Sequence, residues 1–234
     1  MKTFKFLAAT ASAAFLSVGA ASAATIFSAT IEEEQSTTPS PGYTNQFGQA
    51  GLSLTQGDDG TFSLAISVTF TGDLDFSEII GSGQIDNIIG ESTTGGELVT
   101  GLHIHAAERG EGGPVVFSLF DTRIAALGGS NDTDGDNTIQ FNDDGSVTVV
   151  SEWDIGEGTD AGMLADFFFE LANATEGEDI GLYFNLHTAA AASGLIRGQI
   201  VAENDLSPVP VPAALPLFLG AVAAGGAIRR RRAR

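Results

Sequence analysis

The sequence predicts an all-β domain built as an antiparallel sandwich or barrel. Several short segments alternate apolar and polar residues, turn-forming residues separate them, and helical periodicity is sparse. Gly accounts for 30 of the 234 residues, as expected where many strands need sharp turns. We therefore predict one β domain over residues 24–203, between two terminal segments of a different character.

The N-terminal segment is typical of a secretory signal peptide. Lys2 and Lys5 form a basic start, residues 6–20 are an apolar run rich in small side chains, and a small-x-small cleavage pattern ends at Ala23. A first transmembrane helix is the alternative, which the short run disfavours. We expect residues 1–23 to be removed and the domain to be exported to the cell envelope, the outer surface or the medium.

Alternation of apolar and polar residues predicts the strands of the domain. Residues 51–55 and 61–70 alternate in this way, and the Gly and Asp residues of 56–60 turn between them. A second turn, at 142–145, precedes another strand. The remaining predicted strands are residues 101–106, 114–120, 146–153, 182–188 and 194–201.

One short helix is predicted, over residues 160–172. Thr159 or Asp160 could cap its start. An apolar stripe recurs along it at helical spacing, formed by Met163, Leu164, Phe167, Phe168 and Leu171. We interpret this stripe as core packing rather than as a ligand pocket.

All three histidines of the chain lie in two of the predicted strands. Alternate residues of a strand share a face, so His103 and His105 lie together, opposite the aliphatic residues of their segment. His187 likewise shares the polar face of its strand with Tyr183 and Asn185. Because imidazole binds metals and exchanges protons near neutral pH, the histidines are the first candidate for a site.

Two interpretations of the histidines remain open. The His-x-His pair could present two imidazoles to one copper or zinc ion, with His187 as a third ligand. The pair also resembles the copper ligands of Cu/Zn superoxide dismutases, but the further histidines and the disulfide of that site are missing. The alternative, which we favour from sequence, is a structural hydrogen-bonded network of the histidines with Asn185, Thr188 and Arg197.

An acidic loop is the second candidate site. Four of its residues fit positions 1, 3, 5 and 12 of an EF-hand calcium loop, namely Asp132, Asp134, Asp136 and Asp143. Asn137 stands in place of the usual Gly, Asp143 in place of the longer Glu, and flanking helices are absent from the pattern. A calcium-stabilised hairpin loop, which would support calcium-dependent adhesion, and a solvated acidic loop are therefore both open.

Charge and missing motifs exclude several classes of function. Between the terminal segments, three arginines against thirty acidic residues leave a formal charge of −27. This rules against nucleic acid as a partner, because phosphates need a basic surface. No Gly-x-Ser-x-Gly, phosphate-binding loop or His-Glu-x-x-His is present. We predict no catalytic residues and no enzyme, with metal-dependent redox activity the one exception left open.

Three motifs in order carry a family resemblance: Leu102-His-Ile-His105, Tyr183-Phe-Asn-Leu-His-Thr188 and Gly194-Leu-Ile-Arg-Gly-Gln-Ile200. Together they resemble the CHRD domain, named for chordin, over roughly residues 25–202. Leu195 departs from the Glu that the family usually has there. The resemblance implies an immunoglobulin-like β fold without established enzymatic activity. It suggests a binding or structural module at the bacterial cell surface or in the extracellular matrix, with a surface ligand that the sequence does not identify.

The C-terminal segment is typical of a second targeting signal. Residues 204–212 are a Pro-rich linker, and residues 213–234 an apolar helix with an Arg tail. This order resembles the PEP-CTERM sorting tails in their VPLPA form, and it implies a Gram-negative bacterium with an exosortase-type processing protease. Before processing, residues 213–228 would lie in the membrane, with the arginines on the cytoplasmic side. A plain membrane anchor is the alternative.

Overall fold

The computed structural model describes residues 25–36, 46–57, 59–91, 95–122 and 134–203. The predicted signal peptide, Pro-rich linker and sorting helix lie outside these residues and stay predictions. Within the described residues, no helix combines the length and the apolar character that a bilayer crossing requires.

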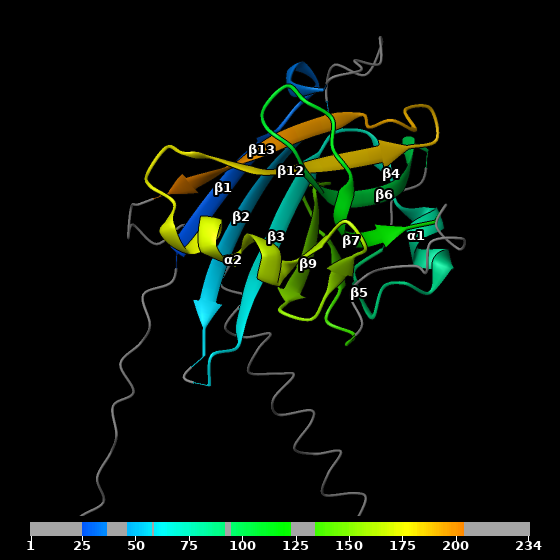
Figure 1. Cartoon of the computed structure of the whole chain (residues 1–234). Helices are drawn as coiled ribbons and strands as arrows, with labels where there is room; N and C mark the ends of the chain where they lie inside the picture. The colour runs from blue at the N-terminus through cyan, green and yellow to red at the C-terminus, as the bar shows by residue number, and fades with distance from the viewer. Residues whose placement is uncertain (1–24, 37–45, 58, 92–94, 123–133, 204–234) are drawn as a thin grey trace, which may run out of the picture.

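Eleven strands form one sheet that curls into a half-barrel (Figure 1). They are β1 (Thr25–Ile31), β2 (Phe47–Gln56), β3 (Phe62–Thr71), β4 (Leu74–Asp75), β5 (Asn87–Ile89), β6 (Glu97–Ala106), β7 (Val115–Asp121), β8 (Thr138–Phe141), β9 (Val147–Asp154), β12 (Asp179–Thr188) and β13 (Ile196–Glu203). Their order is β4-β6-β12-β13-β1-β2-β3-β9-β8-β5, and β7 also pairs with β6. The pairs β4·β6 and β5·β8 are parallel and the others antiparallel.

Smaller elements complete the described chain. They are the 3₁₀ turn η1 (Glu33–Gln35), the helices α1 (Ser77–Ser82) and α2 (Leu164–Asn173), and a short hairpin of β10 (Gly158–Thr159) and β11 (Gly162–Met163). The all-β prediction is thus confirmed. So is the alternation that carried it, because every second residue of β3 from Leu64 to Phe70 is buried.

The predicted helix is confirmed as α2, with a later start. The amide of Met163 donates to the carboxylate of Asp166 at 2.9 Å, which closes the first turn. Met163 therefore precedes the first helical residue, Leu164. Thr159 and Asp160 lie in the β10–β11 hairpin and its turn instead, because the chain reverses there before the helix begins.

The core fills the inside of the curled sheet. Trp153 stacks on Phe117 with ring centroids 5.1 Å apart, and both side chains are fully buried. The indole N–H of Trp153 donates to the carbonyl of Glu157 at 2.8 Å, so its one polar atom is satisfied. Leu164 and Leu171 of α2 are also fully buried, as expected from the apolar stripe of that helix.

One part of the sheet is buried on both faces. All seven residues of β6 from Val99 to His105 are buried, and β12 and β13 have similar patterns. The polar face of these strands is therefore not a solvated outer face. It contacts two loops, residues 107–114 and 189–195, and this second buried face holds the histidines.

Candidate metal centre

Three neighbouring strands bring the histidines together. In the sheet, β12 lies between β6 and β13. Asn185 of β12 pairs with His103 on one side and with Arg197 on the other, and Tyr183 pairs with His105. Since cross-strand partners of an antiparallel ladder project from the same face, the polar faces expected from the two motifs form one surface.

The three imidazoles converge within this surface. Their ring centroids are 4.6 Å apart for His103 and His187, 5.7 Å for His103 and His105, and 5.8 Å for His105 and His187. One ring nitrogen from each side chain lies within 4.8 Å of the other two. All three residues are buried, with exposed fractions of 2 to 8 %. The structure thus assembles the three residues of the candidate copper or zinc site.

Backbone carbonyls orient two of the rings. The Nδ1 atom of His105 lies 2.9 Å from the carbonyl oxygen of Gly113, and the Nδ1 atom of His187 lies 3.0 Å from that of Ala192. A carbonyl oxygen only accepts hydrogen bonds, so in the neutral form of each ring the proton is on Nδ1. The lone pair is then on Nε2, the form of imidazole that binds a metal.

A carboxylate orients the third ring. The Nε2 atom of His103 lies 2.9 Å from a carboxylate oxygen of Asp121, and both side chains are buried. A Cβ on Gly101 would lie 3.1 Å from both partners, so the absence of a side chain there leaves room for this pair. The contact of Nε2 with Asp121 has the distance of an ion pair but not the geometry of a hydrogen bond, and Nδ1 of His103 likewise has no hydrogen bond with a described residue, so His103 can offer a ring nitrogen as a ligand atom.

Burial keeps His105 neutral. Desolvation is the largest cause, and it lowers the pKa of His105 from 6.5 to about 4. The hydrogen bond to Gly113 opposes this shift, while electrostatic interactions with His103 and Arg197 add to it. At neutral pH the side chain is therefore an uncharged donor with a free lone pair.

Arg197 lies beside the histidines and bonds elsewhere. Its guanidinium donates to the carbonyls of Glu111 and Glu108, the latter at 2.9 Å, and to the side-chain oxygen of Gln199 at 3.1 Å. Its central carbon lies 3.5 Å from the centre of the Tyr183 ring. In the favoured sequence interpretation Arg197 belonged to a network with the imidazoles, but its hydrogen bonds run to the 107–114 loop.

Asn185 and Thr188 also bond to a loop. The side-chain amide of Asn185 donates to the carbonyl of Ser193 at 3.2 Å, and the hydroxyl of Thr188 accepts from the amide of Ala191 at 3.1 Å. These contacts hold the 189–195 loop against the sheet, and that loop supplies the carbonyl that orients His187.

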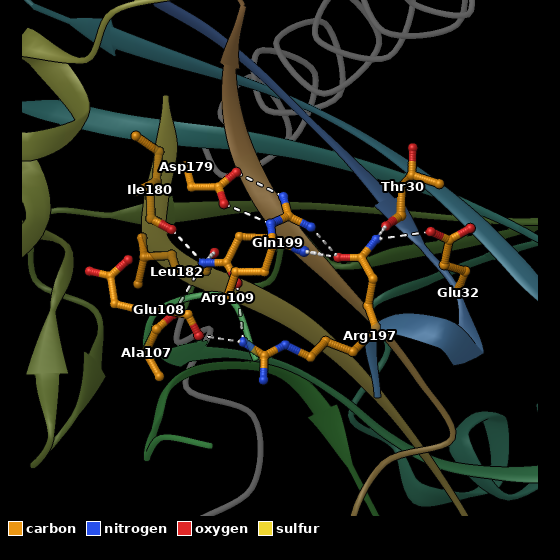
Figure 2. A network of polar contacts seen from close by, with 11 residues as sticks. Thr30, Glu32, Ala107, Glu108, Arg109, Asp179, Ile180, Leu182, Arg197 and Gln199 are labelled. Carbon is orange, nitrogen blue, oxygen red and sulfur yellow. Dashed lines mark hydrogen bonds and ion pairs between the residues drawn. The ribbon is translucent and has the colours of Figure 1, made fainter. Parts of the chain in front are cut away.

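Gln199 fixes the 107–114 loop from a second direction (Figure 2). Its amide nitrogen donates to the carbonyl of Ala107 at 3.1 Å and to the carbonyls of Ile180 and Leu182. Arg197 and Gln199 thereby hold the loop that carries Gly113 over His105. Sequence reasoning did not identify Asp121 or Gly113 as parts of the site, since each acts through spatial contacts that no local pattern encodes. Gln199 lay within the third family motif, which gave it no role.

The acidic loop is described only in part. Asp132 lies outside the described residues, and Asp134 and Asp143 are exposed. A carboxylate oxygen of Asp136 accepts from the backbone amide of Glu152 at 3.1 Å. Across the residues that the structure describes, the three histidines are the group in which three or more candidate ligands converge. The calcium prediction for this loop therefore stays a prediction.

Comparison with known proteins gives one match. Searches of the curated proteins and of the solved structures return none. The family model of the CHRD domain matches residues 27–200, which include β6, β12 and β13 with all three histidines. The motifs, the all-β fold and this match over most of the chain agree, and the chain belongs to the CHRD domain family.

Proposed function

We propose that this CHRD module binds one copper or zinc ion through His103, His105 and His187. One observation carries the proposal: three buried imidazoles converge with one ring nitrogen of each within 4.8 Å of the others, and each ring also has a nitrogen 2.9 to 3.0 Å from a carbonyl or carboxylate oxygen. Metal-binding histidines almost always have such a partner, which fixes the tautomer and the direction of the ring. A network that served only to join strands would not need a nitrogen from each of three rings to converge.

The donor set suits these ions. Zinc binds imidazole nitrogen at about 2.0–2.1 Å, so the nitrogens of a tetrahedral site lie about 3.3 Å apart. The present separations, up to 4.8 Å, would close by small rotations of the rings about their side-chain torsions. Imidazole ligands suit copper as well as zinc, and the general order of affinities favours Cu²⁺. Three protein ligands would leave one position open to water or to a small molecule.

Charge also supports a cation here. The three imidazoles contribute no charge when neutral, and the buried carboxylate of Asp121 adjoins His103. Arg197 opposes the cation, but three hydrogen bonds and the ring of Tyr183 hold its guanidinium. We propose a binding or structural role and no catalytic one.

Metal analysis of the purified full chain tests the proposal. We expect close to one copper or zinc ion per chain. At a free metal concentration of about 100 Kd the added stability is about 2.7 kcal/mol, or roughly 5–10 °C in Tm for a domain of this size. His187→Ala should abolish both effects, whereas Asp134→Asn, the matched control in the acidic loop, should keep both. Sub-stoichiometric metal together with an unchanged Tm would contradict the proposal.

We also propose that the module works outside the cytoplasm, held by or released from its C-terminal tail. The proposal rests on the residue patterns of 1–23 and 204–234. Deletion of residues 208–234 should move the protein from the membrane fraction to the soluble exported fraction. The same distribution with and without the tail would exclude a sorting or anchoring role.

A further inference from the structure

A polar pocket of about 390 Å³ adjoins the histidine cluster. It lies where the 107–114 and 189–195 loops meet β12 and β13. The polar side chains that line it are Ser36, His105, Tyr183, Asn185, Ser193 and Arg197. It shares His105 with the proposed metal centre, while its charge comes from Arg197.

Arg197 is a buried cation without a described carboxylate partner. Only 3 % of the residue is exposed. Its hydrogen bonds go to two backbone carbonyls and one amide oxygen, and Glu108 and Glu111 contribute main-chain oxygens rather than their carboxylates. A guanidinium has five N–H groups, so these three bonds leave two without a described partner.

The two arginines among the described residues, Arg109 and Arg197, differ in how their charges are paired. A buried charge is costly unless it is paired, and burial is the largest cause lowering the pKa of Arg197. The half-exposed Arg109, by contrast, is paired with a carboxylate: it donates two hydrogen bonds, of 2.6 and 2.8 Å, to Asp179. In a chain with 30 acidic residues, the more deeply buried arginine faces a pocket instead.

We propose that this pocket binds a small carboxylate anion, with Arg197 as the counter-ion. The hydroxyls of Ser36 and Ser193 and the amide of Asn185 provide further hydrogen-bonding groups along the lining. The volume of about 390 Å³ is ample for a small carboxylate. A monoanion matches the single guanidinium, whereas phosphate would leave excess negative charge in a protein of net charge −20. This binding requires no metal and goes beyond the function proposed above.

The test uses the full chain after removal of metals with a chelator, and acetate as the probe. Thermal unfolding is followed in sodium acetate and in sodium chloride of equal ionic strength, each at about 100 mM. At this concentration a ligand with a Kd of about 1 mM measurably stabilises the folded chain, because it binds the folded state and not the unfolded one. We expect acetate to raise Tm by several degrees over chloride and phosphate to have a smaller effect. The ¹⁵N resonance of the Arg197 side chain should shift with the same acetate dependence.

Two variants place a carboxylate inside the pocket. Asn185→Asp keeps the shape of the side chain directly across the strand pair from Arg197, and Ser193→Asp approaches from the loop. Either internal carboxylate should occupy Arg197 and abolish the response to acetate. Thr55→Asp, the matched control, adds the same charge at an exposed position of β2 outside the pocket and should keep the response.

Each outcome decides the proposal. Loss of the acetate response in Asn185→Asp and Ser193→Asp with retention in Thr55→Asp supports it. An equal response in all variants would mean that acetate binds elsewhere, and no response in the wild type would mean that Arg197 serves only to hold the 107–114 loop; either result overturns the proposal. Because metal is absent throughout, failure of the metal centre would not alter these outcomes.

Discussion

The neutral, buried state of His105 predicts a specific loss of stability in acid. The pKa of His105 is lowered from 6.5 to about 4, chiefly by burial. Between these two values the unfolded chain binds a proton at His105 that the folded chain does not. Stability therefore rises with pH across this window: the contribution is fully present above pH 6.5 and is lost as the pH falls toward 4.

The size of the effect follows from the shift. One pKa unit corresponds to 1.36 kcal/mol, so lowering the pH from 7 to 4 should remove about 3 kcal/mol through His105 alone. Other groups titrate over the same range, so a matched variant is needed to isolate it. His105→Gln cannot take up a proton, but its side-chain amide can still donate to the carbonyl of Gly113, as the ring does.

The assay is urea unfolding of both proteins at pH 7 and at pH 4, with chelator present. The wild type should lose about 3 kcal/mol more than His105→Gln between the two pH values, whatever the variant costs at pH 7. If both proteins lose the same free energy, His105 is not held neutral by the fold. The free lone pair assigned to Nε2 of His105, on which the metal proposal rests, would then be refuted.

Three further substitutions test the site, the packing of β13 against β1 and the ion pair of Arg109. Asp121→Asn should weaken metal binding by about 10- to 100-fold in isothermal titration, because the partner of His103 would lose its charge; an unchanged Kd would contradict that role. Gly198→Ala should cost about 1–3 kcal/mol in urea unfolding, because the added Cβ would lie 2.6 Å from a backbone oxygen of β1. Arg109→Gln should cost less than about 1 kcal/mol, because its pair with Asp179 is 47 % and 35 % exposed and water screens it.

The sequence predicts best where only one face of a strand is buried. In β3 the alternation of apolar and polar side chains predicts both that the segment is a strand and which of its faces is buried, because the other face is at least partly solvated. In β6 alternation again separates His103 and His105 from the aliphatic residues, and this is confirmed. The pattern did not reveal that the histidine face is buried as well, since the loops that contact it have no periodicity to read.

The contacts that orient the imidazole rings could not be predicted from the sequence either, because they too come from segments without a periodic pattern. Asp121 is the last residue of β7, and no sequence motif predicts the register in which β7 pairs with β6. Gly113 and Ala192 act through their carbonyls, which any residue carries. A sequence therefore displays which residues could bind an ion, but it does not display the main-chain atoms that select the tautomer.

The three motifs that mark the family are one structural unit rather than three. They occupy β6, β12 and β13, which are adjacent, and the pairing sets Asn185 between His103 and Arg197. Arg197 and Gln199 hold the 107–114 loop by its carbonyls, and that loop supplies the carbonyl that orients the ring of His105.

Gly198, between these two residues, brings β13 against β1 at a distance that no Cβ would permit. Each position of the Arg-Gly-Gln motif thus meets a separate physical requirement of the same site. The arginine holds the loop and lends the pocket its charge, the glycine allows close packing of the strands, and the glutamine satisfies carbonyls that would otherwise be buried without donors. The three imidazoles are thus positioned largely through the main chain, because backbone carbonyls rather than flexible side chains contact two of the three rings.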